Sequence, residues 1–205
     1  MKLEILGQNG CEQIDRASKS ILERTGILMP HVEMCRLFKT AGASVDSASG
    51  RVRIPSKLVD ECLAKAGRTF SIYGRDRSKV AAFGVGKRNY NSIAGEAYWI
   101  DRDGGRRFCK LEDVVEAARL AEMLSAINIA GAMADPHEID VRHRVVDVAA
   151  AQLRATTKPI TFWFHDRAST KFVIELFAAV AGSSEALKTY PPAYPFLEPI
   201  SPLRF

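Results

Sequence analysis

The 205-residue chain is 47% apolar and 26% charged, which supports a folded core and disfavours an intrinsically disordered protein. Its 29 basic and 24 acidic residues give a net charge of +5, but they are interspersed, which favours a solvated mixed surface over a nucleic-acid interface. No apolar run approaches the roughly 20 residues of a membrane span, and no signal-peptide pattern opens the chain, so we expect a cytoplasmic protein.

The first part of the chain predicts a small α-rich domain with a β-hairpin. Apolar residues at helical spacing predict helices over 11–25 and 30–41, each followed by a glycine. Residues 43–54 carry the pattern of two short strands around a polar turn, and Pro55 suits the start of a third helix. We place the end of this domain near residue 75.

The second part predicts an α/β fold. Residues 69–108 form short aromatic segments, with a hairpin turn at 101–105. Helix and strand patterns then alternate: helix 111–125, strand 127–133, helix 136–157, strand 159–165, helix 169–181 and strand 194–198. This alternation is typical of parallel β/α units and fits a doubly wound sheet as well as a barrel. Asp135, Pro136 and Glu138 suit a capped start for the helix at 136.

No motif indicates a metal or nucleotide site. Gly84-Val85-Gly86 lacks the third glycine of a dinucleotide fingerprint and favours a plain turn. His137 and His143 lie six residues apart on one predicted helix, hence on different faces, so we expect no metal there. We also expect reduced thiols, because no short spacing separates the four cysteines, Cys11, Cys35, Cys62 and Cys109.

Several stretches resemble the trimethylamine methyltransferase family. They are residues 21–27 (ILERTGI), 41–46 (AGASVD), 51–55 (RVRIP), 73–76 (YGRD), 181–188 (AGSSEALK) and the Pro191-Pro192 turn before the last strand. The resemblance runs nearly end to end and implies a (β/α)8 TIM barrel. Because family members are typically more than twice this length, we expect an N-terminal portion: a domain over 1–75, then an incomplete first half of the barrel over 76–205. One departure from the family pattern is Lys110, which replaces a hydroxyl residue before a helix start and weakens its cap.

The resemblance also implies an activity. Such enzymes move a methyl group from a tertiary or quaternary amine, such as trimethylamine or glycine betaine, to the Co(I) of a separate corrinoid protein. The partners expected here are therefore a small methylated amine and a cognate corrinoid protein, with no cofactor bound directly. A chain with half a barrel is also expected to self-associate or to pair with a companion chain. No catalytic residue is identified.

Strand alternation selects the candidate substrate-binding residues. In a barrel the active site lies at the C-terminal strand ends, on side chains that point inward. The apolar Ile160, Phe162 and Phe164 suit the helix-packed face of their strand, which turns Trp163 and His165 inward. The same reasoning turns Phe196 and Glu198 inward on the last strand, and the small residues Asn128, Ala130 and Ala132 on the strand at 127–133. Trp163, His165, Phe196 and Glu198 could form a cage for a methylated ammonium ion. The alternative is that the rings fill the interior while His165 and Glu198 are ordinary rim residues.

Two other functions are considered. The first 75 residues could form a winged helix that places Arg51, Arg53 and Lys57 on nucleic-acid phosphates, although three basic residues more simply solubilise a hairpin. The chain could also be a non-catalytic remnant of the family.

Overall fold

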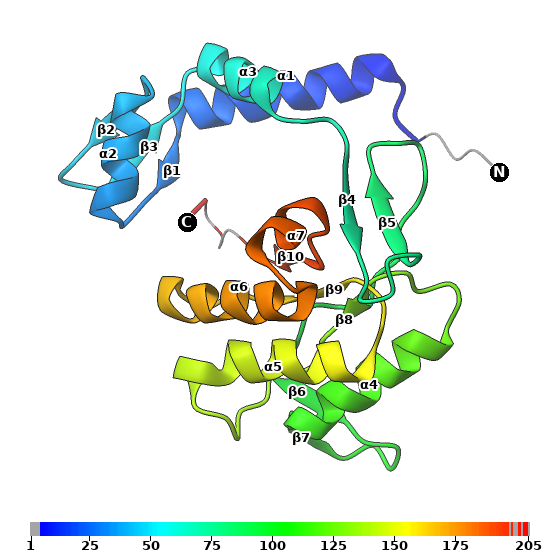
Figure 1. The fold of residues 1–205 in the computed structure, drawn as a ribbon. Coiled ribbons are helices and arrows are strands. Elements are labelled where there is room, and N and C mark those ends of the chain that lie inside the picture. The colour runs from blue at the N-terminus through cyan, green and yellow to red at the C-terminus, as the bar shows by residue number, and fades with distance from the viewer. Residues whose placement is uncertain (1–4, 197, 199–200, 202, 205) are drawn as a thin grey trace. The chain divides into compact units, whose positions relative to one another are not determined.

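The computed structural model describes residues 5–196, 198, 201, 203 and 204, and its chain divides into two compact units (Figure 1). The first unit runs to Gly67 and includes the described residues from Glu198 onward. The second begins at Arg68 and holds the rest of the described chain. Each unit has its own core and is described by itself. The domain boundary near residue 75 remains a prediction.

The first unit is a helical unit with a small antiparallel sheet. Its elements in order are α1 (Gln8–Arg24), β1 (Ile27–Leu28), α2 (Val32–Thr40), β2 (Ser44–Asp46), β3 (Arg51–Arg53) and α3 (Ser56–Lys65). The sheet has the order β1-β3-β2, so the predicted hairpin is confirmed and β1 adds a strand that the sequence pattern did not reveal. The buried core of this unit is small: Ile27, Met29, Ala43 and Val52.

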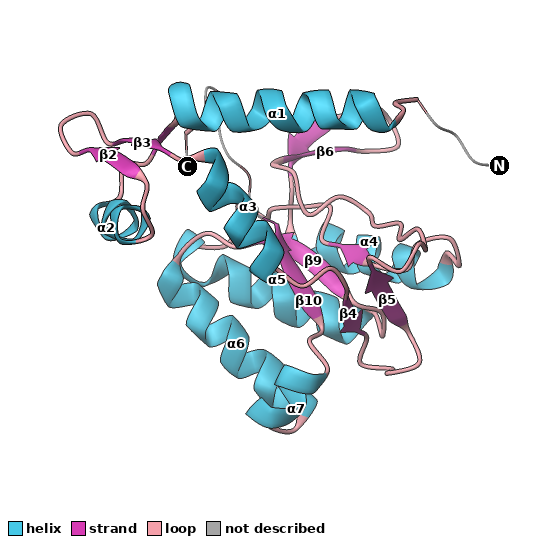
Figure 2. Cartoon of the chain, turned by 90° about the horizontal axis from the view of Figure 1, so that it is seen from above, coloured by secondary structure: helices cyan, strands magenta, loops and turns pink. Residues whose placement is uncertain are grey.

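The second unit contains the α/β part of the chain. It opens with the antiparallel hairpins β4 (Phe70–Tyr73) with β5 (Val80–Phe83) and β6 (Tyr98–Ile100) with β7 (Arg106–Phe108). The elements that follow are α4 (Leu111–Met123), β8 (Ala130–Gly131), α5 (Val141–Ala155), β9 (Ile160–Trp163), α6 (Arg167–Ala181), α7 (Ser184–Thr189) and β10 (Ala193–Phe196). Strands β8, β9 and β10 are parallel, in the order β10-β9-β8. Figure 2 shows β9 and β10 side by side. The predicted alternation of helices with parallel strands is confirmed.

A fourth chain segment runs beside this sheet. Asn91 bridges Ile129 and Glu96 bridges Ala134, both in the parallel sense. Residues 91–96 therefore follow the outer edge of β8 in the same direction as the strands. Gly131 permits this close approach, because a Cβ there would lie 2.1 Å from the carbonyl oxygen of Ile93.

One predicted helix start is wrong. Helix α5 begins at Val141 rather than at 136, because the side chain of Asp140 accepts a hydrogen bond from the Arg142 backbone amide at 2.9 Å and caps it. Glu138 caps another helix instead: its Oε1 accepts from the Leu111 amide at 2.9 Å, at the start of α4. The predicted weak cap at Lys110 is thus supported by a residue from a distant loop.

The two faces of the parallel sheet have different coverings. Helices α4, α5 and α6, which lie side by side in Figure 1, cover the outer face. Their core with the strands includes Val114, Ala130, Val145, Ile160, Phe162, Val173 and Phe177. The β4–β5 hairpin covers the N-terminal half of the inner face, where Ile72 and Ala81 pack with Ile129 and the ring of Tyr194.

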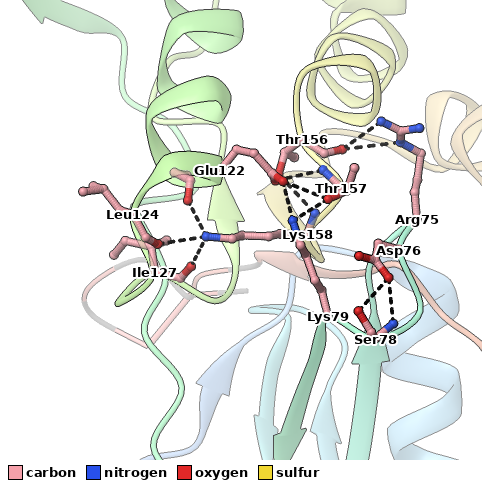
Figure 3. A network of polar contacts seen from close by, with 11 residues as sticks. Arg75, Asp76, Ser78, Lys79, Glu122, Leu124, Ile127, Thr156, Thr157 and Lys158 are labelled. Carbon is pink, nitrogen blue, oxygen red and sulfur yellow. Dashed lines mark hydrogen bonds and ion pairs between the residues drawn. The ribbon is translucent and has the colours of Figure 1, made fainter.

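A polar network holds the β4–β5 hairpin at the N-terminal end of β9 (Figure 3). Lys79 pairs with Glu122 of α4 and donates to Thr157 Oγ1 at 2.6 Å. The Asp76 amide donates to the Thr157 carbonyl at 3.2 Å. Gly74 is required beside it, because a Cβ there would lie 2.0 Å from that same oxygen. Residues 73–76 therefore have a structural role: they attach the β4–β5 hairpin to the segment before β9.

The same network contains a buried lysine. Lys158 is 9% exposed, and its Nζ donates to the carbonyls of Ala121, Leu124 and Ile127 at 2.6–2.8 Å. These carbonyls lie at and just beyond the C-terminal end of α4, where a helix leaves its last acceptors unpaired. Lys158 satisfies them from the segment between α5 and β9 of the same unit. Burial lowers the pKa of its ammonium group.

Candidate functional site

The alternation predicted for β9 is confirmed. Phe162 is 1% exposed and lies in the core between the sheet and α5–α6, where its ring meets Phe177 edge to face. Trp163 lies on the other face. Its ring meets Phe196 of β10 edge to face, with centroids 4.7 Å apart and planes at 85°. This contact follows from the register, because Trp163 and Phe196 are paired residues in adjacent parallel strands.

Trp163 is held in one orientation. Its indole Nε1 donates a hydrogen bond of 2.7 Å to the carbonyl of Gly95, in the segment beside β8. The ring is half-buried, so one part of it packs and another part stays accessible. Because the N–H is already satisfied, the indole offers a ligand its π surface rather than a donor.

The phase predicted for the strand at 127–133 is wrong. Ala130 and Ala132 lie in the core on the helix side, and Ile129 packs on the inner face against the β4–β5 hairpin. Asn128 binds Asn89 and the Tyr90 amide through its side chain. Pairing explains the phase: Ala130 is the partner of Ile160, and paired residues share a face.

A charged cluster that the sequence pattern did not reveal follows strands β8 and β9. His165 follows β9, and its Nε2 lies 3.4 Å from Asp135 Oδ1, in the loop after β8. The other oxygen of Asp135 accepts from Arg144 Nη1 of α5 at 2.8 Å. Asp135, Trp163 and His165 also border one very small cavity of about 10 Å³, whose other walls include the core residues Val145, Val148 and Phe162. The side chains of Asp135 and His165 are 20% and 29% exposed, so solvent or a ligand reaches both.

A signal for Asp135 was present in the sequence. It directly follows a buried strand in a β/α unit, and ligand-binding residues gather at the carboxyl ends of parallel strands. The helix-capping interpretation of Asp135 hid this signal. Arg144 carried no signal of its own, because an arginine inside a helix usually faces solvent. Here its side chain is 12% exposed and also donates to the Ile139 carbonyl.

Glu198 does not extend the site in the predicted way. Strand β10 ends at Phe196, so strand alternation does not reach Glu198, and residue 197 lies outside the described residues. Glu198 is exposed and belongs to the first compact unit, whereas Trp163, His165 and Phe196 belong to the second. Its presence beside those three side chains remains a prediction.

The other histidines and the cysteines have local roles. His137 stacks on Phe108 with ring centroids 4.7 Å apart, and His143 pairs with Asp147 one turn along α5. Cys109 is buried, which raises the pKa of its thiol. Within the described residues the cysteines are free, and no group of three or more His, Cys, Asp or Glu side chains could hold a metal ion.

The basic residues of the first unit serve its own fold. Arg51 Nη1 donates to the Thr25 carbonyl at 3.1 Å, and Arg53 Nε to the Arg24 carbonyl at 3.2 Å. Both arginines thus complete the end of α1. Lys57 pairs loosely with Glu61 along α3, at 3.7 Å. These contacts favour a structural role for Arg51 and Arg53 over phosphate binding.

Aromatic rings and a carboxylate that Arg144 pairs with make up the candidate site. Two aromatic rings and an accessible carboxylate lie at the C-terminal ends of neighbouring parallel strands. Ring faces attract cations through their quadrupoles, and a carboxylate supplies charge. The described part of the chain has no helix long and apolar enough to cross a bilayer. Fold and site together define an α/β protein with a candidate ligand site at the ends of its parallel strands.

Comparison with known proteins identifies the family. Residues 1–205 match the model of the family described as trimethylamine methyltransferase (MTTB), and the chain belongs to this family. A glycine betaine methyltransferase of Desulfitobacterium hafniense is 22% identical over all of this chain and 42% of its own length. A trimethylamine methyltransferase of the same species is 26% identical over 93% of this chain and 39% of its own length. One from Methanosarcina mazei is 26% identical over 55% of this chain and 21% of its own length. The chain thus spans less than half the length of these relatives.

Proposed function

We propose that this chain carries the amine-binding half of a methyltransferase that moves a methyl group from a tertiary or quaternary amine to a corrinoid protein. In this proposal residues 76–205 supply the first half of a (β/α)8 barrel, and residues 1–75 form a preceding domain. Family membership, the parallel β/α units and the relatives' names support it.

The observation that carries the proposal is the ring pair of Trp163 and Phe196 on the inner face at the C-terminal strand ends. Methyl groups on a quaternary nitrogen cannot accept or donate hydrogen bonds. Such a ligand is therefore recognised by ring faces and by negative charge. The indole N–H of Trp163 donates a hydrogen bond to the Gly95 carbonyl, which fixes the orientation of the ring at the site.

Asp135 takes the role that the sequence analysis gave to Glu198. Its carboxylate lies at the same hollow as Trp163, and Arg144 holds one of its oxygens. The second oxygen lies 3.4 Å from His165 Nε2, and the Asp135 side chain is 20% exposed. A methylated ammonium ion beside Trp163 would gain attraction from this oxygen. His165 and Arg144 position the carboxylate.

The residues present bind and orient the amine. Positive charge makes the nitrogen a better leaving group, and alignment of one methyl group toward the acceptor lowers the cost of the encounter. The corrinoid is carried by the partner protein and accepts the methyl group, so it is a substrate. The ends of the strands that would complete the barrel would supply the remaining walls of the site.

Ligand-observed NMR with choline tests the proposal. Its neutral isostere, 3,3-dimethylbutan-1-ol, has the same shape without the charge. We expect choline to bind more tightly, and Trp163→Ala to weaken choline binding by about 1–2 kcal/mol, the scale of a desolvated cation–π contact. Trp99→Phe is the matched control, since the chain has two tryptophans. Equal binding of the two ligands, or an unchanged affinity in Trp163→Ala, would refute the site.

A further inference from the structure

A second hollow lies at the opposite end of the parallel sheet from the candidate amine site. It has a volume of about 280 Å³ and lies between the loop after β4, the C-terminal end of α6 and the segment before β10. Its lining includes Tyr73, Arg75, Arg77, Phe177, Val180 and Tyr190. Two arginines and two tyrosines thus surround one cavity that the proposed methyl transfer does not use.

Arg77 is held at this hollow with its donors unused. Its guanidinium carbon lies 4.2 Å from the centroid of the Tyr190 ring, a cation–π geometry. Within the described chain its side chain donates no hydrogen bond and forms no ion pair, whereas Arg51, Arg53, Arg75, Arg107, Arg142 and Arg144 do. A guanidinium fixed through its face presents its N–H groups at its edge, where an anion binds.

Arg75 adds a second, anchored positive charge. Its Nε and Nη2 donate to the Thr156 carbonyl at 3.4 and 3.3 Å (Figure 3), which leaves Nη1 for another acceptor. The neighbouring carboxylate is engaged elsewhere. Asp76 accepts from the Ser78 hydroxyl at 2.7 Å and from the Ser78 amide at 3.0 Å, and these bonds lower its pKa. Asp76 is not among the residues that line the hollow.

The walls of the hollow are formed in advance. The Tyr73 amide donates to the Pro191 carbonyl at 2.8 Å, which joins the end of β4 to the segment before β10. The rings of Tyr73 and Tyr190 meet edge to face at 5.2 Å. Phe177 and Val180 of α6 complete an apolar side. Ligand binding therefore requires little free energy for ordering the side chains of this site.

We propose that this hollow binds a small organic anion, a phosphate ester or a carboxylate that carries a flat apolar group. The anion would contact the edges of Arg77 and Arg75, and the apolar group would pack between Tyr190, Tyr73 and Phe177. This site is separate from the amine site, so it would serve a second ligand and not the methyl donor. A volume of about 280 Å³ suits a molecule the size of phenyl phosphate.

Calorimetric titration of the chain tests this proposal with four probes. Phenyl phosphate and benzoate each carry both the anion and the ring, whereas inorganic phosphate lacks the ring and phenol lacks the charge. We expect saturable binding of phenyl phosphate, benzoate or both. Inorganic phosphate and phenol should each bind at least about tenfold more weakly. The comparison of phenyl phosphate with benzoate identifies the anion class.

Three variants locate the ligand. Arg77→Gln should weaken binding of the preferred anion about tenfold, the loss of one charge-assisted contact, and Tyr190→Leu should weaken it similarly. Arg102→Gln in the turn after β6 is the matched control, because Arg102 is exposed and lies away from the hollow. Thermal unfolding confirms that each variant is folded. Equal binding of inorganic phosphate and phenyl phosphate, or an unchanged affinity in Arg77→Gln, would overturn the proposal.

Discussion

Asp135 and His165 face each other at 3.4 Å, although they follow different strands of the parallel sheet. For the proposed amine site we predict that Asp135→Asn weakens choline binding about tenfold but changes binding of 3,3-dimethylbutan-1-ol less than about twofold, because only the charged ligand feels the lost carboxylate. The same NMR titration measures both. Glu198→Gln is the comparison: a larger loss in Glu198→Gln than in Asp135→Asn would return the role to Glu198.

Arg107 and Asp113 form an ion pair with two parallel hydrogen bonds, each of 2.7 Å. Asp113 is 2% exposed, and the Arg107 guanidinium lowers its pKa. Arg107→Met removes the charge partner of this buried carboxylate, which keeps the hydrogen bond from the Lys110 amide. We therefore expect a loss of about 3–5 kcal/mol in unfolding free energy by urea titration. The double variant Arg107→Met with Asp113→Asn should recover part of that loss. A single variant as stable as the parent would contradict the prediction.

Glu122 should make the stability of the second unit sensitive to acid. Burial raises the pKa of its carboxyl, but hydrogen bonds from Lys79, Thr156 and Thr157 outweigh that effect and lower it to about 2. Because this folded-state pKa lies below the ordinary value of 4.5, the contribution is fully present above about pH 4.5 and is lost as the pH falls toward 2. Its side chain is 28% exposed, so we expect about 2 kcal/mol after solvent screening.

The measurement is the difference in unfolding free energy between the parent chain and Glu122→Gln across this pH range. That difference should be largest above pH 4.5 and shrink on acidification, whichever other carboxyl groups titrate. A difference that stays constant with pH would show that Glu122 acts by packing alone.

Lys158 is predicted to stabilise the end of α4. Lys158→Met keeps the apolar stem but removes the donor shared by three carbonyl oxygens, of which, within the described chain, only that of Leu124 keeps a second hydrogen bond, from the Ile127 amide. We expect a loss of about 2–4 kcal/mol in unfolding free energy. Lys171→Met, on the exposed side of α6, is the matched control and should change stability by less than about 0.5 kcal/mol. Comparable losses in the two variants would show that the carbonyl cluster contributes nothing specific.

The phase of β9 could be predicted from the sequence, and the phase of β8 could not. Ile160 and Phe162 are large and apolar, so they require the helix-packed face, and their neighbours Thr161 and Trp163 follow. Around β8 both faces carry small or apolar residues, and hydrophobicity does not distinguish them. Pairing of Ala130 with Ile160 decides the phase, and a contact of that kind is invisible in one sequence.

The start of α5 was predicted wrongly for a related reason. Asp135, Pro136 and Glu138 match the local rules for a helix start. In the structure all three lie in the loop before α5, and the two acidic side chains bind residues of other elements. Asp135 binds Arg144 and faces His165, while Glu138 caps α4. Local capping rules see only neighbours in sequence. Tertiary partners redirected these side chains and, with them, the carboxylate of the candidate site.

For the proposed reaction, the β4–β5 hairpin favours one order of binding. It covers the N-terminal half of the inner face through Ile72, Ala81 and Phe83, and the ion pair of Lys79 with Glu122 holds it there. The amine and the corrinoid protein would then both approach the site from the C-terminal ends of the strands. Since the corrinoid protein is by far the larger of the two, its binding would block access for the amine. In the proposed reaction the amine would therefore bind first, and an excess of corrinoid protein should inhibit turnover.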